Sequence, residues 1–131
     1  MSRFVVMGSG ETAPTMVKVH REVFDTSPPG PSVMLDTPFA FQTNRSELVA
    51  RTVGYFAQSL GREVEVAAWS GLEDPAQRER SLALVDRAAW VFAGPGSPSY
   101  ALRQWRGTSL PAALAGAVRR GGTLVLAARL P

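Results

Sequence analysis

Short apolar runs alternate along the chain with longer stretches in which apolar positions recur every three or four residues. The short runs are typical of buried β-strands, whereas the longer spacing places apolar side chains on one face of a helix. Five runs predict strands, at 4–7, 32–36, 63–68, 89–93 and 123–127. Because helical stretches separate them, the pattern predicts an α/β fold, a three-layer sandwich with a mostly parallel central sheet.

Capping residues mark several of the predicted helices. Helices are expected at about 13–24, 44–61, 75–87, 98–105 and 110–119. In the second of these, Asn44 and Glu47 have the spacing of a capping box, and Gly61 is expected to end the helix. Asp74 followed by Pro75 predicts the start of the third. With 131 residues, 45% of them hydrophobic, we expect one domain over 1–131.

The degree of alternation predicts where each strand lies in the sheet. The runs at 4–7, 32–36, 89–93 and 123–127 are apolar throughout, which predicts interior strands, whereas 63–68 alternates and predicts a strand near an edge. An interior fifth strand needs a neighbour and a covering helix, and no further element follows it. We therefore expect a sheet truncated after the fifth strand, in the N-terminal part of a longer protein. Its open edge predicts a homo-oligomer formed through the sheet edge.

Composition excludes several classes of function. The chain has no cysteine, so it offers no thiolate nucleophile and no cysteine-bound metal, and we expect no metal or cofactor. The net charge is +3, but the arginines are scattered rather than interleaved with aromatics on one face, so we expect no nucleic-acid partner. No apolar run approaches the ~20 residues of a membrane span. The apolar run near the start of the chain, at 4–7, is too short for a signal peptide. These features predict a cytoplasmic protein with no membrane partner.

Two glycine-rich turns are the candidate site. Each follows a predicted strand and opens onto a predicted helix, where backbone N–H groups and the helix dipole favour an anion. The carboxyl ends of parallel strands meet at one edge of a sheet, so both turns are expected on the same rim. Turns of this kind bind phosphates, carboxylates or developing oxyanions. The candidate binding residues of the rim are Gly94, Gly96 and Ser97 in one turn and Gly8, Ser9, Gly10 and Glu11 in the other. Strand-to-helix turns also need glycine for geometry alone, and that alternative stays open.

The chain resembles a known family from its first turn to its last strand. The order of strand, Gly-Pro-Gly-Ser-Pro turn at 94–98, two helices, and then Arg-Arg-Gly-Gly-Thr-Leu-Val-Leu-Ala at 119–127 is similar to the class I glutamine amidotransferase-like fold. The resemblance is to the branch that holds the S51 serine peptidases and cyanophycinases, and the turn at 8–11 agrees with the first glycine-rich loop of that branch. The resemblance implies a flavodoxin-like central sheet and a serine hydrolase that cleaves amide or peptide bonds, in which the turn at 94–96 supplies an oxyanion-hole donor. It also implies a small-molecule or peptide ligand that presents a carboxylate or an amide.

The resemblance also implies a nucleophile that this chain lacks. The family's serine follows the strand that matches 123–127, where this sequence reads Ala127, Ala128 and Arg129. The family's histidine comes later still, whereas His20 precedes the second strand, and we interpret it as a partly exposed helix residue. Asp36 is either a polar site residue or a turn former. We assign no catalytic residue and expect an inactive chain, and whether it is an enzyme stays open. The alternative is a non-catalytic anion- or nucleotide-binding module.

Overall fold

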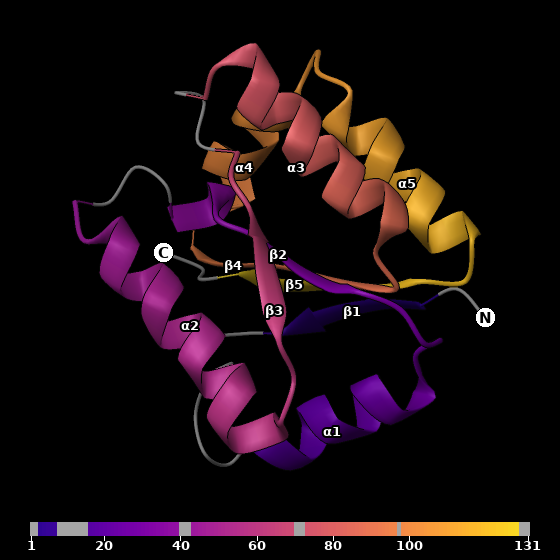
Figure 1. Ribbon diagram of the computed structural model, residues 1–131. Helices are drawn as coiled ribbons and strands as arrows, with labels where there is room; N and C mark the ends of the chain where they lie inside the picture. The colour runs from indigo at the N-terminus through magenta and orange to yellow at the C-terminus, as the bar shows by residue number, and fades with distance from the viewer. Residues whose placement is uncertain (1–2, 8–15, 40–42, 70–72, 97, 129–131) are drawn as a thin grey trace.

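The computed structural model describes residues 3–7, 16–39, 43–69, 73–96 and 98–128 (Figure 1). In chain order the elements are β1 (Arg3–Met7), α1 (Val17–Thr26), β2 (Ser32–Leu35), the 3₁₀ turn η2 (Thr37–Phe39), α2 (Arg45–Leu60), β3 (Val64–Ala67), α3 (Pro75–Arg87), β4 (Trp90–Gly96), α4 (Pro98–Trp105), α5 (Leu110–Arg119) and β5 (Thr123–Ala128).

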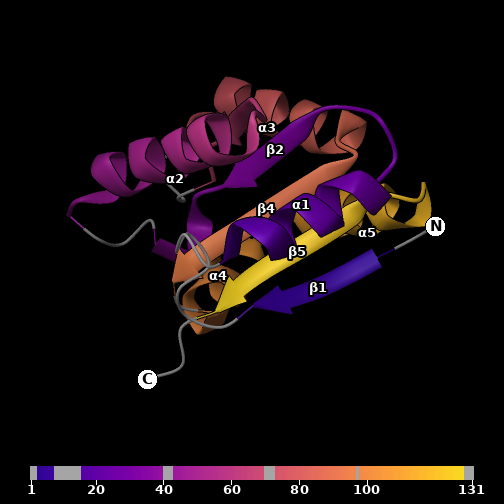
Figure 2. The same ribbon diagram turned by 90° about the horizontal axis from the view of Figure 1, so that it is seen from below.

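The strands form one five-stranded sheet between two layers of helices. The strand order is β1-β5-β4-β2-β3, and every pair is parallel. Helices α1 and α2 cover one face, α3 and α5 cover the other, and α4 lies near the carboxyl ends of the strands (Figures 1 and 2). The predicted α/β sandwich is therefore confirmed.

Alternation along the strands divides the core into two apolar clusters, one on each face. On β4, Trp90 and Phe92 face α1 and α2, whereas Val91 and Ala93 face α3 and α5. Successive side chains of a strand point to opposite faces, so one apolar run serves both layers. The helices contribute residues such as Phe24 and Phe56 on the first face and Val85, Leu110 and Leu114 on the second.

The positions of the first and last strands differ from the sequence prediction. Strand β5 is interior, as expected, but the expected open edge beside it was wrong. Strand β1 pairs with it along Arg3–Met7, and β4 pairs with it on the other side. The expectation that β1 is interior was wrong, since β1 pairs only with β5 among the described residues. Apolar side chains on both faces of a short strand do not reveal whether its outer edge is paired. The alternating β3 lies at the opposite edge, as predicted.

The structure confirms two of the three predicted helix caps. The Asp74 carboxylate accepts a hydrogen bond from the Gln77 N–H at 2.8 Å, and Gly61 ends α2 in the left-handed conformation with φ of 65°. Asn44 occupies the N-cap of α2, but its side chain makes no capping hydrogen bond. The capping box predicted from Asn44 and Glu47 was therefore wrong in its chemistry, although it placed the helix start correctly.

Candidate functional site at the carboxyl ends of the strands

The order in which the chain adds strands to the parallel sheet reverses between β2 and β4. The helix α2, which follows β2, lies on one face, whereas α4 and α5, which follow β4, lead to β5 on the other side (Figure 1). In open parallel sheets, ligands bind outside the carboxyl ends of the strands at such a reversal, because the two connections diverge and leave a crevice. Figure 2 shows the arrowheads of β4, β5 and β1 at one end of the sheet. The topology therefore assigns the candidate site to this rim.

Gly94 lies directly against the end of β5. A Cβ atom at Gly94 would stand 2.4 Å from the Ala127 carbonyl oxygen and 2.8 Å from the Ala127 Cβ, and the φ of Gly94 is +137°. Both the conformation and the close approach require glycine. On its other side, Ala127 is in register with Met7 of β1. The ends of β1 and β4 thus converge on Ala127.

The strand β4 does not stop at Gly94, contrary to the sequence prediction. It continues through Gly96 with one extra residue, since Ala93 is in register with Leu126 whereas Gly96 is in register with Ala128. An extra residue of this kind is a β-bulge, which turns the chain locally and is common beside binding sites. The glycines at 94 and 96 were expected to end the strand, but here they accommodate the bulge.

A buried hydrogen-bond network fixes the neighbouring end of β2. The Asp36 carboxylate accepts a hydrogen bond from the Trp69 N–H at 2.8 Å. The Thr37 hydroxyl donates to the Trp69 carbonyl at 2.6 Å and accepts from the Trp105 indole N–H at 3.1 Å. These four residues are all buried and tie β2, the segment after β3, and α4 together. Asp36 thus has a structural role in joining the end of β2 to the segment after β3, and its part in the site stays a prediction.

The structure describes only part of the predicted site. Gly94 and Gly96 lie on the rim, as expected. Ser97, Gly8, Ser9, Gly10 and Glu11 lie outside the described residues, so their assignment stays a prediction. Sequence reasoning missed the network of Thr37, Trp69 and Trp105, because Thr37 and Trp105 are 68 positions apart and have no local pattern in common.

His20 is a core residue rather than a partly exposed one. Its exposed fraction is 0%, and its ring packs edge-on against Phe56 at 5.1 Å and Phe92 at 6.3 Å between ring centroids. A signal was present in the sequence, since His20, Val23 and Phe24 have the i, i+3, i+4 spacing of one helix face. This packing places the imidazole under the middle of β4, on the α1 side of the sheet, and not at the rim.

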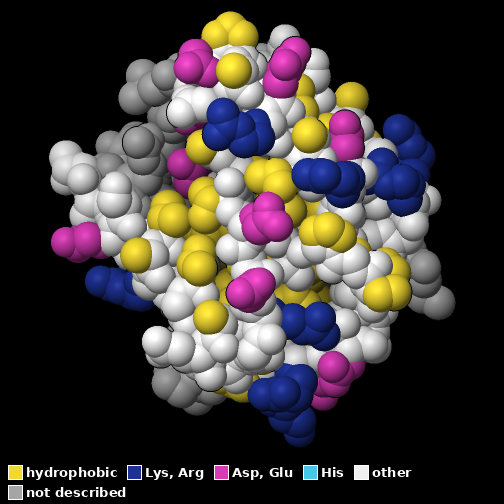
Figure 3. Space-filling view, in the orientation of Figure 1, with side chains coloured by type: hydrophobic (Ala, Val, Ile, Leu, Met, Phe, Trp, Pro, Cys, Tyr) yellow, Lys and Arg dark blue, Asp and Glu magenta, His cyan; other side chains and the backbone are white. Residues whose placement is uncertain are grey.

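Three further findings concern the surface charges, the helices and possible metal ligands. Basic and acidic side chains are interspersed over the face shown in Figure 3. None of the helices in the described part of the chain is long and apolar enough to cross a lipid bilayer. Within the same residues, no group of three or more histidine, aspartate or glutamate side chains is placed to hold a metal ion.

Comparison with known proteins gives a likeness of fold. No family model matches the sequence, and no curated protein matches it. Among solved structures, a peptidase from an acI-B1 Actinobacterium superposes with a TM-score of 0.79 at 20% sequence identity. The match covers 97% of this chain and 54% of the peptidase chain, so this chain spans about half the length of the solved protein. The chain therefore has the α/β fold of about half of that peptidase.

Proposed function

We propose that the chain carries the ligand-binding rim of a serine-hydrolase-like α/β fold, of the S51 peptidase and glutamine amidotransferase-like type, without its own hydrolytic chemistry. The rim binds a small carboxylate, or the carbonyl of an amide, through backbone N–H groups. The observation that carries the proposal is the contact of the bulged glycine turn at Gly94 with Ala127.

The geometry supports this role in two ways. First, a bulge at the end of β4 turns the backbone at the place where two connections diverge, and oxyanion holes in acyl transfer are built from backbone donors of this kind. Second, the contact joins the glycine turn to the strand whose end would hold the nucleophile in the family that the sequence resembles. One solved structure that superposes on this chain is a peptidase.

The residues at the end of β5 argue against hydrolysis by the chain itself. An acyl-enzyme mechanism needs a nucleophilic side chain and a base within hydrogen-bond reach. The residue that Gly94 contacts is Ala127 and the next is Ala128, and neither side chain can attack a carbonyl. The single histidine of the chain is His20, which is buried among aromatic rings.

Two measurements on the full chain test the proposal. Dipeptides, glutamine and chromogenic esters are expected to show no turnover above background. Sulfate is expected to bind weakly, because each helix N-terminus favours an anion by only about 0.3–1 kcal/mol. Glu11→Gln removes a negative charge from the predicted first turn and should tighten sulfate binding, whereas the exposed Glu65→Gln on β3 is the matched control.

The outcomes separate the alternatives. If the chain hydrolyses any of these substrates and Ser97→Ala abolishes that activity, the proposal that the chain does not catalyse hydrolysis is contradicted. Unchanged or weaker sulfate binding in Glu11→Gln would contradict the binding rim. Tight binding of a nucleotide, with no binding of sulfate or of small carboxylates, would favour the nucleotide-binding module instead.

A further inference from the structure

The short helix α4 connects the glycine rim to the buried network at the end of β2. Its first residue, Pro98, comes two positions after Gly96 of β4, and its last residue is Trp105. Two turns span only about 12 Å, and helices this short are marginal in isolation, so contacts with the rest of the chain decide how α4 lies. Ala101 and Trp105, one turn apart, pack into the apolar cluster on the α3 and α5 face. A contact that fixes Trp105 therefore also fixes the helix end that borders the rim.

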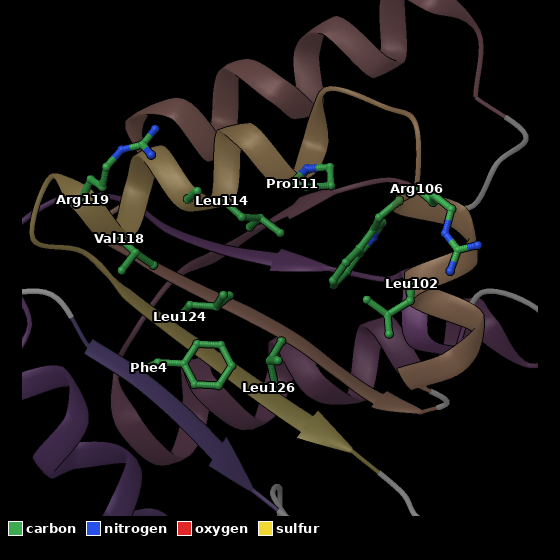
Figure 4. A pocket seen from close by; sticks show the side chains of 11 residues that line it. Phe4, Leu102, Arg106, Pro111, Leu114, Val118, Arg119, Leu124 and Leu126 are labelled. Carbon is green, nitrogen blue, oxygen red and sulfur yellow. The ribbon is translucent and has the colours of Figure 1, made fainter.

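Packing leaves one side of Trp105 without close neighbours. An open apolar hollow of about 700 Å³ lies between α4, α5 and the strands β5 and β1, and Trp105 is one of the residues that line it. Figure 4 shows Leu102 of α4 at this hollow, with Phe4 and Leu126 on its sheet side. Atoms that border such a space lose dispersion contacts on that side. The indole of Trp105 therefore depends more on its hydrogen bond than a ring that is packed all round.

The Thr37 hydroxyl makes this hydrogen bond, and its direction is determined by the partners. The Trp69 carbonyl can only accept, so the hydroxyl proton points to it. The Trp105 indole N–H can only donate, so it binds a lone pair of the same oxygen. Thr37 is 0% exposed, which shields both bonds from solvent, and it begins η2, which packs against both β4 and α4. One hydroxyl thus joins the end of β2, the segment after β3 and α4.

We propose that Thr37 and Trp105 are positioning residues of the anion-binding rim, because their hydrogen bond sets the tilt of α4 and thereby the direction of the backbone N–H groups at its start. The inference rests on the proposed function, since it takes this rim as the place where the anion binds. Leu35 of β2 is in register with Ala93 of β4, so the residues after Leu35 lie level with the bulge at 94–96. Hydrogen bonds weaken steeply when the donor is misaligned, so a small tilt of a two-turn helix is enough to weaken binding.

The test measures sulfate binding by the full chain in variants that remove or keep single hydrogen-bonding groups. Thr37→Val keeps the shape of the side chain and removes the hydroxyl, and it should raise the sulfate dissociation constant about two- to fivefold, the contribution of one helix N-terminus. Thr37→Ser keeps the hydroxyl and should restore binding to within about 1.5-fold of the wild type. Trp105→Phe removes the indole N–H and should match Thr37→Val. The double variant should bind no more weakly than either single variant, because both remove the same bond.

Trp90→Phe is the matched control for the loss of an indole. Trp90 is 1% exposed, lies at the opposite end of β4, and has no hydrogen-bond partner for its Nε1 among the described residues. This variant removes the same atoms and leaves a cavity in the core, but it breaks no hydrogen bond. It should bind sulfate as the wild type does. Equal weakening in Trp90→Phe and Trp105→Phe would show that general loosening of the core controls the rim, and would overturn the proposal.

Backbone amide shifts of the isotope-labelled chain without sulfate separate this inference from the proposed function. The amides of 96, 97 and 99 should move in Thr37→Val and keep their wild-type positions in Thr37→Ser. If they do so while the wild-type chain binds no sulfate, the proposed function fails, although the start of α4 still depends on Thr37. If the wild-type chain binds sulfate and Thr37→Val leaves the dissociation constant unchanged, the positioning role fails and the proposed function stands. Unmoved amides in Thr37→Val also overturn the positioning role, whether or not sulfate binds.

Discussion

Replacing Gly94 with alanine tests the contact that defines the rim. Two costs arise in the folded state. A non-glycine residue held at φ of +137° is strained by about 1–3 kcal/mol. The new Cβ would also stand 2.4 Å from the Ala127 carbonyl oxygen, which is backbone and cannot rotate away, and overpacking of this kind costs about 1–3 kcal/mol.

The sum predicts a loss of roughly 2–6 kcal/mol, a large share of the 5–15 kcal/mol that stabilises a typical domain. At about 3–5 °C per kcal/mol for a chain of this size, Tm should fall by more than about 6 °C. Thermal and urea unfolding followed by tryptophan fluorescence measure this change, because Trp69 and Trp90 are each 1% exposed.

Gly54→Ala is the matched control. Gly54 lies within α2, and a Cβ there has nothing within 4 Å. Alanine favours the helix by about 0.5–1 kcal/mol, so this variant should be more stable than the wild type. A Gly94→Ala protein within about 1 kcal/mol of the wild type, with Gly54→Ala behaving as expected, would refute the close approach of β4 to Ala127.

Two other predictions concern the core. Thr37→Val leaves the Trp69 carbonyl and the Trp105 indole N–H without their partner, so it should lower the free energy of unfolding in urea by about 2–3 kcal/mol. Thr52 is similarly buried but donates to the Leu48 carbonyl within its own helix, so Thr52→Val should lower it by less than about 1 kcal/mol. Equal losses in the two variants would contradict the network. Burial raises the pKa of Tyr55 above its ordinary value of 10.0, so the folded state holds the phenol proton more tightly than the unfolded state and loses stability as pH rises above about 10. Unfolding measured at pH 9 and pH 11 should show a smaller loss in Tyr55→Phe than in the wild type, and an equal loss would contradict the pKa shift.

The sequence predicts which segments form helices and strands better than it predicts which strands lie next to each other in the sheet. The runs that became β2 and β4 are apolar because both faces of those strands are covered, and the same local rule predicts that β3 lies at an edge. The rule fails for β1, since Phe4 faces a hollow that no described element fills. Apolar composition reports on the faces of a strand, whereas edge pairing depends on contacts distant in sequence.

The candidate site shows the same limit. Glycine and proline at 94–96 predicted an interruption at the correct place, but whether the strand ends or bulges is decided by its pairing with β5. Asp36 was identified as polar and near the rim, yet its partner at Trp69 is 33 positions away. Long-range partners of this kind leave no periodic signal in the sequence.

The most direct test of the binding rim is a titration of the isotope-labelled chain with sulfate and with acetate, followed by backbone amide shifts. Binding at the rim predicts saturable shifts concentrated at Gly94, Gly96 and Ser97 and at residues 8–11, with β3 and the amino ends of the strands unaffected. Saturable shifts centred on other residues would contradict the proposed function. So would the absence of any saturable shift as the sulfate or acetate concentration is raised.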